Sequence, residues 1–88
     1  MNMTSTQTIA VIEFMNIHGA ENIEGPVEAY DRVTYGCDAY ILEIYNNRHI
    51  AWYKDGKSWR EDGKPATITN DGREYYYNED GSVNRYSR

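Results

Sequence analysis

The stretch WREDGKPATITNDGREYYYNEDG, residues 59–81, holds three Asp-Gly steps separated by short runs rich in aromatic or β-branched residues. An Asp-Gly pair is typical of a tight hairpin turn, because both residues tolerate the positive φ that such a turn requires. A further Asp-Gly step, Asp55–Gly56, precedes the stretch. The runs between the steps have the length of a short strand with its turn flanks. Residues 55–81 therefore predict a meander of antiparallel hairpins.

The alternative for the same stretch is a site that binds a calcium ion or a phosphate. A calcium loop of the helix-loop-helix kind needs carboxylates at alternate positions and a closing glutamate, and residues 55–80 supply one acid or an acidic pair at each turn. The phosphate-binding patterns G-x-x-x-x-G-K-[ST] and G-x-G-x-x-G do not occur. The sequence therefore favours turn formation over ligand binding, and we expect no metal and no cofactor.

N-terminal to these hairpins, the segment 38–45 has apolar side chains on both of its faces, which is typical of a central strand. An Asn-Asn pair at 46–47 predicts a turn, since asparagine tolerates positive φ, and a return strand over 48–54. These two strands extend the meander to residues 38–88.

The N-terminal part is less regular. The polar residues 1–7 are expected to be disordered. Residues 9–17 are rich in β-branched and aromatic side chains and are read as a strand, although Thr4 followed by Gln7 leaves a capped helix open.

A short helix is predicted over 26–34 and is expected to end at Gly36. Pro26 suits a first helical turn, and Val27, Tyr30 and Val33 recur at helical spacing. The predicted fold is thus one β-rich α+β domain over 1–88, with a strand and a short helix in 8–36 and an antiparallel β-meander in 38–88.

Composition limits the classes of protein. A chain of 88 residues has one modest core, so a homodimer is physically plausible. Nine tyrosines argue against disorder, because disordered chains are poor in aromatic residues. Tyrosine suits half-buried sheet positions and also protein contact surfaces.

Charge is unevenly distributed. Residues 1–44 hold seven acids and one base, whereas residues 45–88 are nearly balanced. Neither half has the basic stripe of a nucleic-acid binder. An acidic face instead favours a basic patch on another protein. The residues predicted to bind a partner are the acids Glu21, Glu24, Glu28 and Asp31 with the neighbouring Tyr30 and Tyr35; the alternative is plain solvation of these acids.

Catalysis is not expected. Cys37 with His18 or His49 would need spatial contact and an activated thiol, and a lone cysteine at a strand start is more often structural. The acidic pairs Glu61–Asp62 and Glu79–Asp80 fall at expected hairpin tips, where their carboxylates remain solvated. One cysteine, no signal-peptide pattern and no long apolar run indicate a cytoplasmic protein without a membrane segment.

The C-terminal half contains an internal repeat. At an offset of 25 residues, the pattern aromatic-x-x-D-G-x-x-x-R occurs twice, with Arg60 in the first copy and Arg85 in the second. Each arginine is expected to pack on, or pair beside, an aromatic ring of a neighbouring strand.

Residues 52–66, WYKDGKSWREDGKPA, with the tyrosines at 75–77, resemble a MORN-like hairpin repeat of small phage, viral and bacterial accessory proteins. That repeat runs roughly W-Y-x-x-G-x-x-H-R-x-D-x-x-P-A, then G, Y-Y, G and R. The matching positions are Trp52, Tyr53, Gly56, Arg60, Asp62, Pro65, Ala66, Gly72, Tyr76, Gly81 and Arg85. Trp59 stands where the repeat has histidine. The resemblance implies a hairpin sheet, no catalytic residues, and a phage or mobile-element origin.

Two function classes follow. The first is a small non-enzymatic inhibitor that binds a bacterial host protein, such as a nucleic-acid-binding defence complex (CRISPR or restriction) or a toxin, which it would neutralise as an antitoxin does. The second is a structural module that self-associates through its sheet edges or tyrosines.

Overall fold

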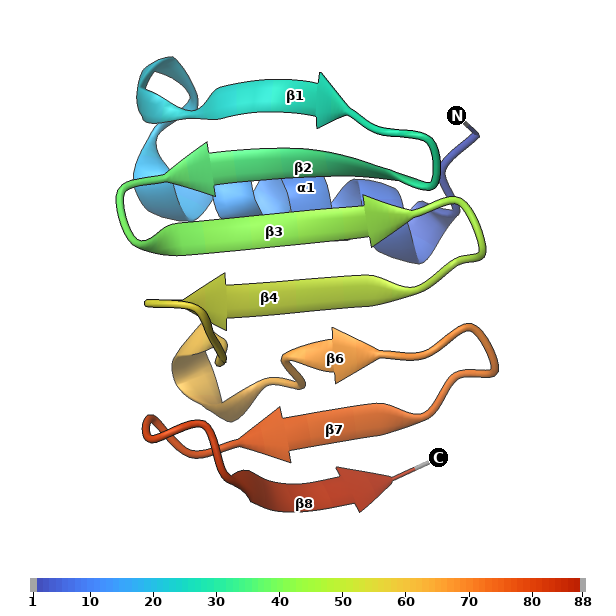
Figure 1. Cartoon of the computed structure of the whole chain (residues 1–88), viewed down its shortest axis with the longest axis vertical. Coiled ribbons are helices and arrows are strands. Elements are labelled where there is room, and N and C mark those ends of the chain that lie inside the picture. Colours follow the sequence, from blue (N-terminus) through green and yellow to red (C-terminus); the bar gives the residue numbers. More distant parts are fainter. Residues whose placement is uncertain (1, 88) are drawn as a thin grey trace.

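One α-helix and one antiparallel sheet of eight short strands make up the computed structural model, which describes residues 2–87 (Figure 1). The predicted β-rich α+β class and the meander of hairpins are confirmed. In chain order the elements are α1 Ser5–His18, the 3-10 turn η1 Ala20–Asn22, β1 Glu24–Glu28, β2 Arg32–Cys37, β3 Tyr40–Tyr45, β4 Ile50–Lys54, β5 Lys57–Ser58, the 3-10 turn η2 Glu61–Gly63, β6 Thr67–Ile68, β7 Glu74–Tyr77 and β8 Val83–Ser87.

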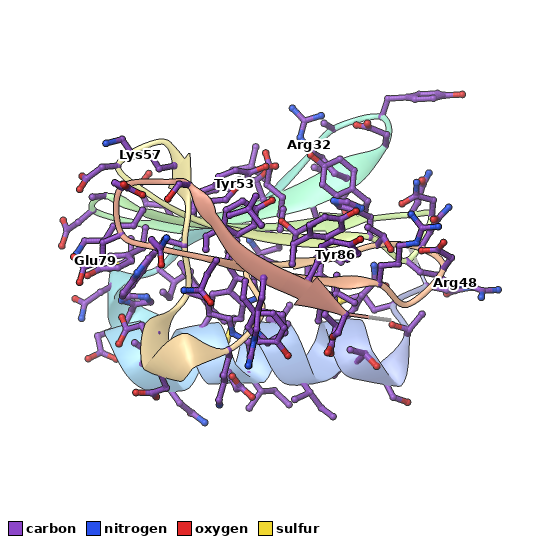
Figure 2. The ribbon with its side chains drawn as sticks, turned by 90° about the horizontal axis from the view of Figure 1, so that it is seen from below. Arg32, Arg48, Tyr53, Lys57, Glu79 and Tyr86 are labelled. Atoms are coloured by element: carbon purple, nitrogen blue, oxygen red, sulfur yellow. The ribbon has the colours of Figure 1, made fainter. Side chains whose placement is uncertain are left out.

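The strands lie in the order β1-β2-β3-β4-β6-β7-β8, so β1 and β8 form the two edges. Strand β4 shares its outer side between two partners: Ile50 and Ala51 pair with β6, and Tyr53 and Lys54 pair with the short β5. Helix α1 packs on one face of the sheet (Figure 1). Within residues 2–87, no helix covers the opposite face (Figure 2).

The core lies between α1 and the central strands. Residues 33, 35, 42, 44, 50 and 52 alternate along β2, β3 and β4 and point toward the helix, since Val33 pairs with Ile44 and Leu42 with Trp52. From α1 they meet Ala10, Val11 and Phe14. Burial of this apolar surface is the main force that holds α1 on the sheet.

The predicted hairpin over 38–54 is confirmed, with a difference at its turn. Strands β3 and β4 pair in register, and the amide of Tyr45 donates to the carbonyl of His49. The residue with positive φ is Arg48, at +79°, and neither asparagine adopts it. The turn therefore includes one residue more than the Asn-Asn pair.

Three of the four Asp-Gly steps connect strands as predicted. Asp55 and Gly56 both have positive φ, the conformation of a two-residue hairpin turn. Asp71–Gly72 and Asp80–Gly81 lie between β6 and β7 and between β7 and β8. Asp62–Gly63 instead forms the end of η2, where the chain crosses toward the helix side before β6.

The strand predicted over 9–17 is wrong, and so is the disorder predicted for residues 4–7, which form the cap and first turn of α1; residue 1 lies outside the described residues. The buried side chains of α1 are Gln7, Ala10, Val11 and Phe14, which follow the spacing of one helical face. Thr4 and Gln7 form a reciprocal capping box that starts the helix. Capping and this buried face outweigh the modest β preference of the isoleucines and valine.

The helix predicted over 26–34 is also wrong, because this segment is the hairpin of β1 and β2. Residues 32–37 alternate in burial as a strand does, with Val33 and Tyr35 buried. Pro26 is tolerated because β1 is an edge strand, in which a missing N–H costs no ladder bond. Tyr30, expected on a helical face, lies in the connection and is fully exposed.

Candidate protein-binding surface

The acidic residues predicted to bind a partner lie along one edge of the sheet. Glu21 is in η1, Glu24 and Glu28 begin and end β1, and Asp31 follows in the hairpin connection. All five residues of β1 are exposed. Glu24 lies opposite Gly36 and Glu28 opposite Val33, three residues along β2, so the two glutamates are about 10 Å apart and the acids follow one another in a row along this edge. We call Glu21, Glu24, Glu28 and Asp31 the acidic edge.

Within residues 2–87, ion pairs engage one member of this row. Asp31 accepts from Arg32, with Nη1 and Oδ1 2.9 Å apart. Glu21, Glu24 and Glu28 have no such partner in the described part of the chain. Their charges are therefore not neutralised by an ion pair within the described residues and can attract a basic partner to this edge.

Strand β1 is poorly suited to adding another strand. Pro26 has no N–H to donate, and the pairing of β1 with β2 shifts register between Glu24 and Val27. Proline and bulges are common devices that prevent edge-to-edge pairing. Contact at this edge is therefore expected through side chains.

The hairpin connection adds an aromatic contact group to the acidic edge. Tyr30 projects fully into solvent, and Ala29, Tyr30 and Asn46 line a shallow hollow with Glu28 and Val33. Tyrosine in such a position offers a rigid apolar ring at low entropic cost. The structure thus brings together five of the six predicted binding residues.

The prediction for Tyr35 is wrong. Its side chain is 5% exposed and belongs to the core beneath α1. Burial raises the pKa of its hydroxyl, and the charge of Glu28 raises it further. Tyr35 therefore supports the strand that carries the acidic edge and does not contact a partner directly.

A second surface, missed from the sequence, lies on the face of the sheet away from α1. Alternation along β3 and β4 turns Glu43, Tyr45 and Tyr53 away from the core, and Figure 2 shows Tyr53 on this side. Tyr75 and Tyr86 pair across β7 and β8 with stacked rings 5.6 Å apart. We call Tyr45, Tyr53, Tyr75 and Tyr86, together with Glu43, the tyrosine face.

Glu43 lies among the tyrosines of β3 and β4, at one end of the tyrosine face. The hydroxyl of Tyr45 donates to Glu43 Oε1 at 2.8 Å, and Arg32 Nε lies 3.4 Å from Oε2. The carboxylate is 18% exposed. The sequence does contain a signal for this cluster, because Glu43 is the one acid in an otherwise apolar central strand. A buried acid of this kind usually has hydrogen-bond partners nearby.

The environment of this cluster shifts the titration of its tyrosines. Burial, then the hydrogen bond and charge of Glu43, raise the pKa of Tyr45 to about 12. Burial and Glu43 also raise the pKa of Tyr53. Burial lowers the pKa of His49, which packs edge-on against Tyr45.

Tyr45 is therefore expected to ionise well above an ordinary tyrosine. A folded pKa above the unfolded value of 10.0 contributes stability below pH 10, and this contribution is lost as pH rises toward about 12. The difference in tyrosinate absorbance between the wild type and Tyr45→Phe, recorded after a rapid pH jump, should isolate this group. Glu43→Gln should move its midpoint partway back toward 10; a wild-type midpoint already at 10 would contradict the proposed cluster.

Among the described residues, no hydrogen bond joins the candidate nucleophile Cys37 to His18 or His49. His18 lies between the rings of Phe14 and Tyr40, with centroids 4.5 and 4.6 Å away, and His49 lies at the β3–β4 turn. Cys37 is half-buried at the end of β2. In residues 2–87 no group of three or more His, Cys, Asp or Glu is placed to hold a metal ion. Nor does the described chain contain a helix long and apolar enough to cross a membrane.

The predicted packing of the repeated arginines is confirmed. The Arg60 guanidinium lies 4.3 Å from the centroid of the Trp52 ring, and that of Arg85 lies 4.2 Å from the Tyr76 ring. Both contacts are close enough for a cation–π interaction. Both arginines therefore stack on an aromatic ring, but at positions that are not equivalent, because Trp52 corresponds to Tyr77 in the repeat and Arg85 packs on Tyr76.

These features define the class as a small α+β protein with one helix on one face of an antiparallel sheet. Comparison of the chain with protein-family models, with curated proteins and with solved structures gave no match. The acidic edge and the tyrosine face are therefore the two features of the molecule that bear on its function.

Proposed function

We propose that this chain is a small non-enzymatic protein that binds and blocks a bacterial protein through the acidic edge, with the tyrosine face beside it. The observation that carries the proposal is the row of acids along the exposed β1 edge of the sheet, three of which have no ion-pair partner in residues 2–87. Such a row complements a basic surface and accelerates association with it.

A basic surface is typical of proteins that bind nucleic acid. The partner class favoured by this chemistry is therefore a nucleic-acid-binding defence complex, of the CRISPR or restriction kind, or a toxin. The resemblance of residues 52–85 to the MORN-like repeats of phage accessory proteins supports the same interpretation, and would place the chain in the cytoplasm of the host cell. Occupying the basic surface would exclude the nucleic acid by competition.

Charge reversal at the acidic edge tests this proposal. Affinity capture from a bacterial lysate, followed by mass spectrometry, should return one dominant stoichiometric partner. Glu24→Lys with Glu28→Lys is expected to reduce capture at least tenfold at low salt, and less at high salt, because exposed charges are screened. Binding is measured by calorimetry or surface plasmon resonance over a range of salt concentrations.

The matched control lies at the opposite edge of the sheet. Glu79→Lys changes net charge as much as Glu28→Lys does, and Glu79 lies between β7 and β8 (Figure 2). If the two single variants weaken capture equally, net charge and not the acidic edge is responsible. Capture that neither substitution nor salt affects would exclude the acidic edge as the contact.

The alternative function is a structural module that self-associates through the β8 edge. Val83 and Tyr86 on this edge strand are 54% and 67% exposed, and β8 contains no proline. An unblunted edge is a template for pairing with another chain. Oligomers that form without any partner and are abolished by Asn84→Pro would favour this alternative over the inhibitor.

A further inference from the structure

The outer side of α1 carries an apolar stripe that nothing in the described chain covers. Ile9 and Ile12 are 56% and 52% exposed, and Ser5 and Asn16 on the same side are also exposed. At about 100° per residue these positions lie opposite the buried face of α1. Figure 2 shows the sheet on one side of α1 and no element of residues 2–87 beyond the other side. Ile17, 44% exposed, flanks the stripe.

The four stripe positions have the spacing of a coiled-coil seam. Ser5, Ile9, Ile12 and Asn16 are separated by four, three and four residues, which is the alternation of heptad positions a and d. The buried face of the same helix is separate, because Gln7, Ala10, Val11 and Phe14 satisfy it. The helix is therefore apolar on two sides, and the core uses one.

The stripe is also electrically neutral in a chain of net charge −5. The one acid in α1, Glu13, lies beside the stripe and is paired within the chain, 2.6 Å from Arg60 and 3.4 Å from Lys64. Two copies of an acidic protein repel each other except where they present an uncharged surface. The exposed isoleucines of α1 meet that condition, whereas Val27 lies between the glutamates of β1 and the exposed Val83 and Tyr86 of β8 flank a charged arginine.

We propose that the stripe is a dimer interface, occupied by α1 of a second copy in antiparallel orientation. A two-fold axis between Ile9 and Ile12 places Ile9 of each copy opposite Ile12 of the other. The same axis places Ser5 opposite Asn16, so polar ends meet polar ends and apolar centres meet apolar centres. Antiparallel helices also align their dipoles favourably.

The interface is small, which sets the strength of the dimer. A helix of 14 residues is about 21 Å long, and a single helix pair buries less than the roughly 1,200 Å² typical of stable complexes. The dimer is therefore weak and concentration-dependent. It leaves both tyrosine faces outward and both acidic edges free, so this inference does not depend on the proposed function.

Sedimentation equilibrium over a wide concentration range tests the dimer. The wild-type mass should rise from 10.3 kDa toward twice that value, and Ile12→Glu should remain at 10.3 kDa throughout. Ile12→Gln, which adds no charge, should weaken association at least tenfold. Val83→Glu, at an equally exposed position on β8, should dimerise as the wild type does. A monomeric wild type, or a dimer that survives Ile12→Glu and is lost in Val83→Glu, would overturn the proposal.

Cross-linking tests the orientation. In a Cys37→Ala background, mixing the variants Ser5→Cys and Asn16→Cys should give a disulfide between the two chains, faster than either variant alone gives a homodimer. Faster linking of each variant to itself would indicate parallel helices and contradict the antiparallel interface.

Discussion

Replacing Arg60 with alanine is expected to lower the free energy of unfolding by about 3 kcal/mol, because a nearly buried cation connects three parts of the fold. Its side chain is 9% exposed. One nitrogen lies 2.6 Å from Glu13 of α1, another donates to the carbonyl of Pro65 at 3.1 Å, and the guanidinium covers Trp52. The substitution removes all three contacts at once.

The pH dependence of this loss follows from Glu13. Burial raises the pKa of Glu13, but the hydrogen bond and charge of Arg60, together with Lys64, outweigh burial and hold the pKa below its ordinary value of 4.5. A lowered folded pKa gives stability that is present above pH 4.5 and lost as pH falls through the folded value. The difference between wild type and Arg60→Ala should therefore shrink in acid, as measured by urea unfolding.

Lys64→Ala is the matched control for Arg60→Ala. Lys64 contacts the same carboxylate oxygen at 3.4 Å, but its side chain is 49% exposed, so its loss should cost less than about 1 kcal/mol. Equal effects of the two variants would show that charge near Glu13, and not the buried contacts of Arg60, stabilises this region. A double-mutant cycle of Arg60→Ala with Glu13→Gln separates the ion pair from the ring contact.

Arg60 also illustrates what the sequence predicts well. The hairpins of residues 38–88 are local, and their turns are specified by Asp-Gly steps in which the conformation of one or two residues decides the chain direction. The packing of Arg60 and Arg85 on aromatic rings is predicted from the repeated arginine, although the particular ring that Arg85 contacts is not. Such features need no knowledge of the rest of the fold.

The N-terminal half was mispredicted because its conformation depends on tertiary contacts. The segment 9–17 has a strand composition, and it becomes a helix because Phe14 and its neighbours meet the face formed by β2, β3 and β4. The local sequence indicates a helix start at Pro26, because the position of this residue at a sheet edge is known only from the complete strand order. Local propensity does not contain that information.

The residues of the candidate surface show the same difference between features that the local sequence predicts and features that depend on the tertiary structure. Exposed charge is a local property, and the acids at 21, 24, 28 and 31 are together on one edge even though no helix carries them. Burial is not local, so Tyr35 was assigned to the surface and lies in the core. The tyrosine face depends on register across β3, β4, β7 and β8, which the sequence alone does not fix.

Gln7 is the site of the second large effect: Gln7→Ala is expected to cost about 3 kcal/mol. Its side chain is 1% exposed and bonds in two directions. Nε2 donates to the carbonyls of Tyr45 at 2.6 Å and His49 at 3.3 Å, and Oε1 accepts from the amide of Thr4 at 3.0 Å. Alanine leaves a cavity and removes these bonds together.

The control for Gln7→Ala is Thr4→Ala, which removes the cap alone. Thr4 accepts from the amide of Gln7 at 3.1 Å and has no bond to the sheet, so its loss should cost about 1 kcal/mol. The excess for Gln7→Ala, about 2 kcal/mol, measures the contact between the start of α1 and the β3–β4 turn. Urea unfolding of both variants decides the point: if Gln7→Ala is no worse than Thr4→Ala, Gln7 acts as a helix cap and does not anchor α1 to the sheet.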